Sequence, residues 1–221
     1  LVDILKVLYG DLRKTGYEYE VIVIDNGSKD GSEKLATIAN SYNMGVSIAR
    51  NQGIDASSGE YIFMLDGDIV PVENSINCLL KYLEDNPLKY AIGFHANKFT
   101  NQKNKNGQKH HEIFCYKLFD VQIYKKACVY YGLFRKNLFD KGVRFETSGE
   151  FGKQGYGWEE IDFYKQMEKR GIEQYVAHIN SPSGKYYHDV NSSIKCMGHD
   201  EYIRTSKARH EQFKKKWKIN A

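Results

Sequence analysis

The chain has 221 residues, of which 41% are hydrophobic and 27% are charged, as is usual for a globular protein with a buried core. Its formal net charge of +4 arises in the tail, because residues 195–221 carry eight Lys or Arg against three Asp or Glu and the remainder is near neutral. A nucleic-acid-binding protein would place its basic residues along a reading surface, so this distribution argues against that class.

The cysteines and the apolar runs indicate the compartment. The four cysteines show no spacing typical of zinc ligands, so we expect free thiols in a reducing compartment. No apolar run approaches the ~20 residues that a membrane-spanning helix needs, and no signal peptide is recognised. We therefore expect a cytoplasmic protein. Apolar residues recur at helical spacing from Leu1 onward, so we also expect that an upstream strand is missing from this sequence.

Apolar periodicity and turn residues predict alternating helices and strands in the first part of the chain. We expect helices at 1–14, 30–42, 49–57 and 73–83, and strands at 19–25, 46–48, 61–65 and 90–94. This alternation predicts an α/β fold with a mainly parallel sheet flanked by helices. Because ligands bind at the carboxyl ends of strands in such sheets, the acidic turns after residues 25 and 65 are expected to face one crevice.

The second part of the chain is less regular. The polar segment 96–112 predicts a loop, and a glycine-rich stretch from 149 to 157 precedes an expected helix over 158–169. An expected strand over 174–179, a short strand over 185–188 and a basic C-terminal helix follow. This helix has two interpretations: it lies on an anionic membrane surface, at the inner face of the membrane, or it packs Phe213 and Trp217 on the domain. The second interpretation is favoured.

The triplet Asp66-Gly67-Asp68 follows the apolar strand 61–65 directly. Carboxylates two residues apart at a strand end can point into one crevice, and hard oxygen ligands suit Mg²⁺ or Mn²⁺. Gly67 lets the backbone approach a ligand closely. By itself the triplet is a weak signal, and an acidic turn that caps the next helix is the alternative.

The segment VIVIDNGSKDGS, followed by ARNQGIDASSGEYIFMLDGDIVP, resembles the nucleotide-binding half of family 2 glycosyltransferases, which have the GT-A fold and an Asp-x-Asp motif. The resemblance implies a nucleobase contact at Asp25 with its neighbour Asn26, and a nucleotide crevice lined by Arg50 and Asn51. It places Asp66 and Gly67 near the ribose or metal, and it makes Asp68 the metal ligand. For Asp25 the alternative is a turn-forming residue, and for Arg50 it is a surface salt bridge.

The segment from Gly155 to Asp162 (GYGWEEID) resembles the family's Gly-Trp-…-Glu-Asp motif at the start of a helix. The resemblance assigns the general base to Glu160, where the family has Asp, with Glu159 and Asp162 as fallbacks. Acidic residues in a first turn also favour the helix dipole without any catalytic role. Trp158 is either a stacking platform for the acceptor or a core aromatic. His188 corresponds to a family region that places a metal-binding His, so it is a candidate third ligand.

These features predict one GT-A domain over 1–221, with a nucleotide-sugar-binding half (1–95) and an acceptor-binding half (96–221). The expected activity is inverting, Mn²⁺- or Mg²⁺-dependent transfer from a nucleotide-sugar, with UDP as the expected nucleotide, to a glycan, lipid-linked or protein acceptor. Two alternatives stay open, a sugar-phosphate nucleotidyltransferase and a catalytically inactive nucleotide-sugar-binding module. No GxGxxG follows a strand, which disfavours a dinucleotide oxidoreductase.

Overall fold

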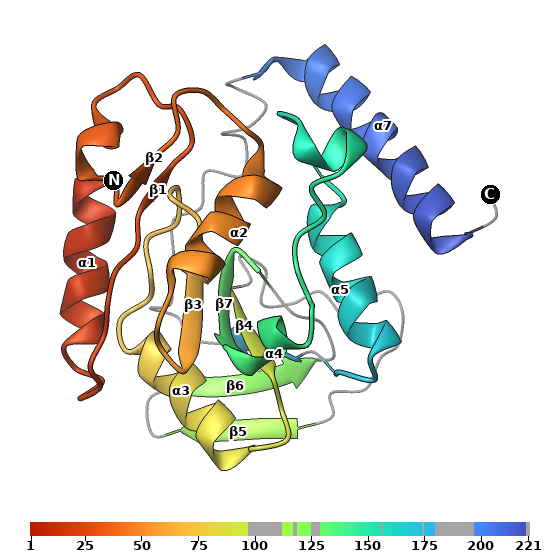
Figure 1. Cartoon of the computed structure of the whole chain (residues 1–221). Helices are drawn as coiled ribbons and strands as arrows, with labels where there is room; N and C mark the ends of the chain where they lie inside the picture. Colours follow the sequence, from red (N-terminus) through yellow and green to blue (C-terminus); the bar gives the residue numbers. More distant parts are fainter. Residues whose placement is uncertain are drawn as a thin grey trace. The chain divides into compact units, whose positions relative to one another are not determined.

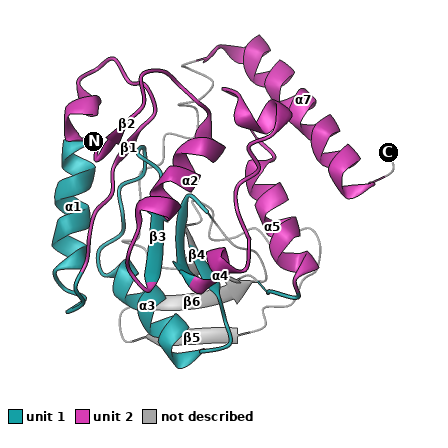
Figure 2. Cartoon of the chain, in the orientation of Figure 1, with its two compact units in different colours: residues 1–18, 61–136, 171–189 teal, residues 19–60, 137–170, 190–221 magenta. Residues whose placement is uncertain are grey.

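The structure is a computed structural model of the chain. It describes residues 1–96, 112–116, 119–124, 129–155, 157–173, 175–179 and 197–219. These form two compact units, which are described separately (Figure 2). Unit 1 comprises Leu1–Glu18, Tyr61–Lys136 and Gly171–Asp189, and unit 2 comprises Tyr19–Glu60, Asn137–Arg170 and Val190–Ala221. The expected loop 96–112 and short strand 185–188 lie almost entirely outside the described residues.

Unit 1 contains a six-stranded sheet with two helices, α1 (Val2–Leu12) and α3 (Ser75–Asp85) (Figure 1). The strands in sheet order are β3 (Tyr61–Leu65), β7 (Tyr131–Arg135), β4 (Ala91–Ala96), β8 (Tyr175–Ile179), β6 (Phe119–Tyr124) and β5 (Glu112–Tyr116). The β4–β8 pair is parallel and the other neighbours are antiparallel. Since β3 and β4 both pair with β7, β3, β4 and β8 run in the same direction.

The expected α/β class is therefore confirmed, as are the helix near 1–14 and the strands at 61–65 and 90–94. The antiparallel insertion of β7 between β3 and β4 did not follow from the sequence pattern. β7 comes after both of those strands in the chain, and its place depends on pairing across many intervening residues.

The apolar face of α3 forms much of the core of unit 1. Ile76, Leu79, Leu80 and Leu83 recur at helical spacing, are almost fully buried, and α3 packs against β4 and β7. Each such side chain contributes about 1.5–3 kcal/mol when it is fully buried. Asp11 of α1, itself buried, accepts hydrogen bonds from the backbone N–H groups of Asn74 and Ile76, so α1 caps the N-terminus of α3.

Unit 2 contains a parallel pair of two-residue strands, several helices and short 3₁₀ turns. The elements are β1 (Ile24–Asp25), η1 (Ser32–Leu35), β2 (Ile38–Ala39), α2 (Val46–Ala56), α4 (Asn137–Asp140), η2 (Gly149–Gly152), α5 (Glu159–Lys169) and α7 (His199–Trp217). The helix near 158–169 and the basic C-terminal helix are confirmed. In unit 2, Phe213 is 4% exposed, which supports the packed interpretation of α7.

Three expectations in unit 2 are wrong. The helix over 30–42 is reduced to η1, because Thr37 and Ile38 donate backbone hydrogen bonds to Val23 and the chain continues into β2. The expected strand 46–48 is the first turn of α2, which follows Gly45 at φ 91°. The expected strand 19–25 is limited to Ile24–Asp25. In the first case pairing with a distant residue, Val23, overrides local propensity.

No helix among the described residues combines the length and the apolar character that crossing a membrane requires.

Candidate active site

Asp25 ends β1 and closes the turn that follows it in unit 2. The side chain is 6% exposed, and Oδ2 accepts hydrogen bonds from the N–H groups of Gly27 (3.1 Å) and Ser28 (3.0 Å). Gly27 has φ 85°, and a Cβ there would lie 2.5 Å from the backbone of Tyr42. The turn therefore requires glycine and holds the Asp25 carboxylate in one orientation.

Asn26 holds the next loop in place. Its Oδ1 accepts from the N–H of Met44 (3.0 Å) and from Nδ2 of Asn40 (3.3 Å), and its Nδ2 donates to Oδ1 of Asn43 (2.9 Å). Asn40 exchanges two further hydrogen bonds with Gln52 of α2, at 2.9 and 3.0 Å. This amide network joins β1 to α2. It is a positioning role that the sequence pattern did not indicate for Asn26.

Asp66, Gly67 and Asp68 form a turn at the end of β3 in unit 1. The N–H of Asp66 donates to the carbonyl of Tyr130 (3.0 Å), and the N–H of Ile69 donates to the carbonyl of Asp66 (3.1 Å). Both residues are half-buried and Gly67 is exposed. Apart from its two chain neighbours, no atom of the described residues lies within 4 Å of where its Cβ would lie. Open space beside two carboxylates fits Mg²⁺ or Mn²⁺, which keeps waters and binds phosphate oxygens as well.

No group of three or more His, Cys, Asp or Glu side chains that could hold a metal ion is present among the described residues. His188 lies outside those residues, so its assignment as a metal ligand stays a prediction.

Trp158 precedes α5 in unit 2 and has φ 70°, a left-handed conformation that few non-glycine residues adopt. Its ring stacks on His210 of α7, with centroids 3.9 Å apart, and lies 5.3 Å from the ring of Phe213. These contacts support the strained conformation at the start of α5. Trp158 therefore has a packing role, and its acceptor contact stays a prediction.

Asp162, in the first turn of α5, is fully buried and accepts three side-chain hydrogen bonds. Its Oδ1 accepts from Nε1 of Trp217 (2.7 Å), and its Oδ2 accepts from Nζ of Lys216 and Nε2 of Gln166, both at 2.9 Å. These bonds attach the end of α7 to α5. Asp162 thus has a structural role that accounts for its burial.

Glu159 is the second acidic side chain of this turn, and 9% of it is exposed. Its Oε2 accepts from Nη1 of Arg209 (3.0 Å), and its Oε1 lies 3.9 Å from Nη1 of Arg50. Glu160 keeps 27% of its side chain exposed, and its Oε1 lies 3.6 Å from Nη2 of Arg50. Of the three acidic candidates, Glu160 is the most exposed.

Arg50 of α2 is 11% exposed in its side chain, and its guanidinium lies over the ring of Phe145, 5.2 Å from the centroid. This arrangement presents one cation to both glutamates of α5. Asn51, the next residue, pairs with the backbone of Phe145: Nδ2 donates to its carbonyl (2.9 Å) and Oδ1 accepts from its N–H (3.1 Å). The segment around residue 145 is thereby fixed to α2.

The sequence pattern does not single out Arg209, which counts there only among the basic residues of 195–221. It is 1% exposed, and besides Glu159 it donates to the carbonyls of Glu150 (3.2 Å), Lys153 (2.8 Å) and Gly157 (3.4 Å). Burial lowers its pKa, and the nearby Glu159 carboxylate opposes that shift. Arg209 therefore binds the loop that precedes α5. One signal in the sequence is its helical spacing on α7, four residues before Phe213.

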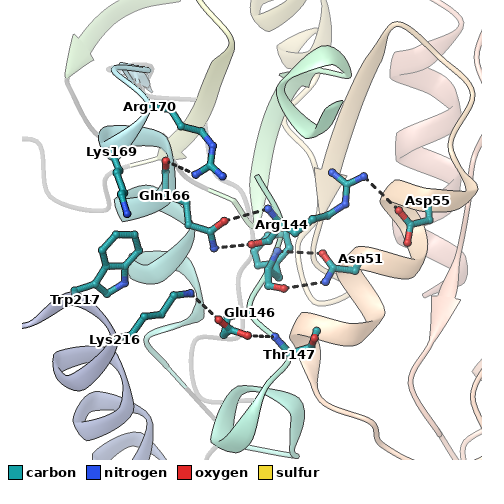
Figure 3. A pocket seen from close by; sticks show the side chains of 11 residues that line it. Asn51, Asp55, Arg144, Glu146, Thr147, Gln166, Lys169, Arg170, Lys216 and Trp217 are labelled. Atoms are coloured by element: carbon teal, nitrogen blue, oxygen red, sulfur yellow. Dashed lines mark hydrogen bonds and ion pairs between the residues drawn. The ribbon is translucent and has the colours of Figure 1, made fainter. Parts of the chain in front are cut away.

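A pocket of about 700 Å³ lies within unit 2 (Figure 3). Its walls come from α2, the segment 144–147, the second half of α5 and the end of α7, and they include Asn51 and Trp217. Neither Glu159 nor Glu160 lines it.

Comparisons with known proteins identify a family. The family model "Glycosyl transferase family 2" matches residues 3–143. An uncharacterised glycosyltransferase of Rickettsia felis is 28% identical over 155 residues, which cover 63% of this chain and 25% of the relative. One from Haemophilus influenzae is 23% identical over 211 residues, covering 83% of this chain and 64% of the relative. The chain thus matches only a quarter of the Rickettsia protein's length.

Two further matches carry more specific names. The poly(ribitol-phosphate) beta-N-acetylglucosaminyltransferase TarP of Staphylococcus aureus is 34% identical over 89 residues, or 34% of this chain and 27% of that protein. Among solved structures, the mannosyltransferase PcManGT from Pyrobaculum calidifontis in complex with GDP-Man and Mn²⁺ superposes with a TM-score of 0.51. It is 14% identical in sequence, and the match covers 82% of this chain and 54% of that chain. This likeness shows the fold, which is of the expected GT-A type.

Proposed function

The chain belongs to glycosyl transferase family 2, and we propose that it transfers a sugar from a nucleotide-sugar to an acceptor hydroxyl, with a divalent metal and with inversion. This proposal rests on the difference in exposure among the three acidic side chains in the first turn of α5. The Asp162 and Glu159 carboxylates accept hydrogen bonds from side chains of unit 2 and are almost fully buried. Glu160 is the more exposed carboxylate at the position that the family motif assigns to the general base.

In the proposed reaction, Glu160 takes the proton of the acceptor hydroxyl while the hydroxyl oxygen forms a bond to the anomeric carbon. The bond from that carbon to the nucleoside diphosphate breaks in the same step, and its electron pair leaves with the diphosphate. A single displacement of this kind inverts the anomeric configuration. The Arg50 guanidinium lies 3.6 Å from the Glu160 carboxylate.

The two acidic turns belong to different units and carry separate assignments. We assign Asp25 to the base of a UDP-sugar, through Oδ1, because both turn hydrogen bonds end on Oδ2. Asp66 and Asp68 are the residues that would hold Mn²⁺ or Mg²⁺. Bound there, the cation would offset the charge that grows on the leaving diphosphate. The mannosyltransferase of similar fold binds GDP-Man with Mn²⁺, so GDP is the competing nucleotide.

The acceptor is a glycan, a lipid-linked sugar or a protein, with Trp158 as the proposed contact. The name of TarP specifies poly(ribitol-phosphate) as its acceptor, so polyol phosphates belong in any acceptor panel. A sugar-phosphate nucleotidyltransferase is disfavoured by the family match, and an inactive binding module is separated from an enzyme by the assay below.

The test is a donor screen. The protein is incubated with Mn²⁺ and a panel of UDP-, GDP- and ADP-sugars, and released nucleotide is measured with and without acceptors. We expect release from a UDP-sugar, and its loss in the Glu160→Gln variant, which keeps size but removes basicity. Release from a GDP-sugar alone would overturn the nucleotide assignment. Donor binding without any turnover across the panel would instead indicate a binding module.

A further inference from the structure

The pocket in unit 2 is a feature that the proposed reaction leaves without a role (Figure 3). Its volume of about 700 Å³ lies within the range of small-molecule sites. Six charged side chains line it, and these are Arg144, Lys169, Arg170, Lys216, Asp55 and Glu146. Cations therefore outnumber carboxylates in the lining, and they still do when the fully buried Asp162 behind it is counted.

Both lining carboxylates are paired with lining cations. Asp55 lies 3.5 Å from Nη2 of Arg144, and Glu146 lies 2.7 Å from Nζ of Lys216. Burial by itself would raise the pKa of Glu146, but hydrogen bonds from Lys216 and from the Ser148 N–H hold that pKa at about 2. Glu146 is therefore charged at physiological pH and can accept hydrogen bonds from hydroxyl groups.

Lys169 and Arg170 supply the excess charge. Among the described residues, neither has a carboxylate within ion-pair distance. The guanidinium of Arg170 donates to the carbonyls of Lys141 (3.1 Å), Gln166 (3.0 Å) and Gly142 (3.3 Å), which fix its position without neutralising it. The ammonium of Lys169 lies 5.9 Å from the ring centroid of Trp217. Arg170 is thus held in place before any ligand arrives, and Lys169 is an exposed cation beside the Trp217 ring.

Basic residues in the last turns of α5 and α7 also complement the dipoles of those helices. That role requires only positive charge near the last carbonyls of each helix. It does not explain why cations, carboxylates and the anchored Trp217 ring surround one cavity. The indole N–H of Trp217 binds Asp162, so its ring is a rigid wall between Lys169 and Lys216 (Figure 3).

We propose that this pocket binds a phosphorylated sugar or polyol, with the phosphate at Lys169 and Arg170 and the hydroxyl groups at Glu146 and its neighbours. The cavity is too large for one inorganic phosphate, and its carboxylates match hydroxyl donors rather than a second anion. The phosphate has two possible sources, a soluble phosphorylated glycan or the headgroup of a phospholipid. Binding here does not depend on the proposed transfer reaction.

The experiment uses the two tryptophans as reporters. The full chain is labelled with ¹⁵N-tryptophan, and the two indole signals are assigned with Trp158→Phe, which leaves only Trp217. Glucose 1-phosphate should shift the Trp217 signal saturably at physiological ionic strength, and glucose should not. Vesicles of phosphatidylcholine with and without phosphatidic acid form the lipid arm, read by co-sedimentation.

Lys169→Met should weaken glucose 1-phosphate binding at least about tenfold, because it removes one of two charges that contact the phosphate. The matched control is Lys165→Met, one turn earlier on α5, where Lys165 pairs with Glu168 at 2.6 Å and does not line the pocket. Equal effects of the two variants would overturn the proposal, as would the absence of a saturable shift together with no binding to phosphatidic acid. Equal weakening of UDP binding by Lys169→Met would assign the pocket to the donor and also overturn it.

Discussion

The guanidinium of Arg209 on α7 donates a 3.0 Å hydrogen bond to the carboxylate of Glu159 on α5, and the two side chains are 1% and 9% exposed. Glu159 is the immediate neighbour of Glu160, the proposed base. The same arginine binds three carbonyls of the loop before α5. The C-terminal helix therefore determines the position of the first turn of α5, and with it the position of Glu160.

Removing Arg209 should be strongly destabilising. Arg209→Ala leaves the Glu159 charge buried without its main partner and removes three hydrogen bonds to backbone carbonyls, and breaking such a pair costs about 3–5 kcal/mol. Urea denaturation measures the change in the free energy of unfolding. Arg204→Ala on the same helix is the control, since Arg204 pairs with Glu201 at the surface and such pairs contribute about 0–1 kcal/mol. Similar losses in the two variants would contradict the role given to Arg209.

Glu160→Gln should lower the transfer rate about 10²–10⁴-fold while donor binding persists, because only the proton acceptor is lost. Glu159→Gln and Asp162→Asn should act mainly on stability, since both side chains hold α5 to residues of the same unit. Single-turnover kinetics on the folded fraction separate the two effects. Near-normal transfer by Glu160→Gln, with an inactive Asp162→Asn, would place the base elsewhere. Retention of the anomeric configuration by NMR would exclude direct displacement.

Asp68→Ala should abolish metal-dependent binding of the nucleotide-sugar, because one of two carboxylates beside Gly67 is removed. Calorimetric titration of UDP with and without Mn²⁺ measures this loss. Asp3→Ala, which removes an exposed carboxylate of α1, is the control. Full turnover in EDTA would show that the reaction needs no divalent metal and would remove the role assigned to Asp66 and Asp68.

Acid should destabilise the protein partly through Glu146, whose pKa falls from an ordinary 4.5 to about 2 in the folded state. A group with a lowered folded pKa contributes stability above its unfolded pKa, and that contribution is lost as the pH falls from about 4.5 to about 2. The contribution is at most about 3 kcal/mol, and solvent screening reduces it. Glu146→Gln should therefore lose less stability than the parent over this range in urea unfolding. An identical pH dependence would contradict the Lys216–Glu146 interaction.

Several features of the site could be predicted from the sequence, because they depend on residues that are adjacent in the chain. The acidic turn after β3 follows from an apolar run that ends in Asp66, and the start of α5 follows from a glycine-rich loop before an acidic first turn. Asp25 as a turn-forming residue was likewise an alternative that local spacing suggested, and its carboxylate does close that turn.

The sequence does not show which carboxylates of α5 accept internal hydrogen bonds, because the side chains that donate those bonds lie far away in the chain. Trp217 is 55 residues from Asp162, and Arg209 is 50 residues from Glu159. The same limit explains the wrong helix over 30–42, where Thr37 pairs with Val23, and the unforeseen place of β7 between β3 and β4. Long-range pairing is not encoded in local periodicity.

The sequence by itself determined the family, the α/β class and the residue types available for chemistry, because these depend on local composition, periodicity and motif order. Tertiary structure alone decided that Asp162 and Glu159 are held by α7, that Asn26 and Asn51 fix backbone segments, and that four cations surround one pocket. The physical reason is that burial and hydrogen-bond partners decide whether a carboxylate or an amide is structural or remains accessible to a ligand, and both are set by contacts between distant parts of the chain.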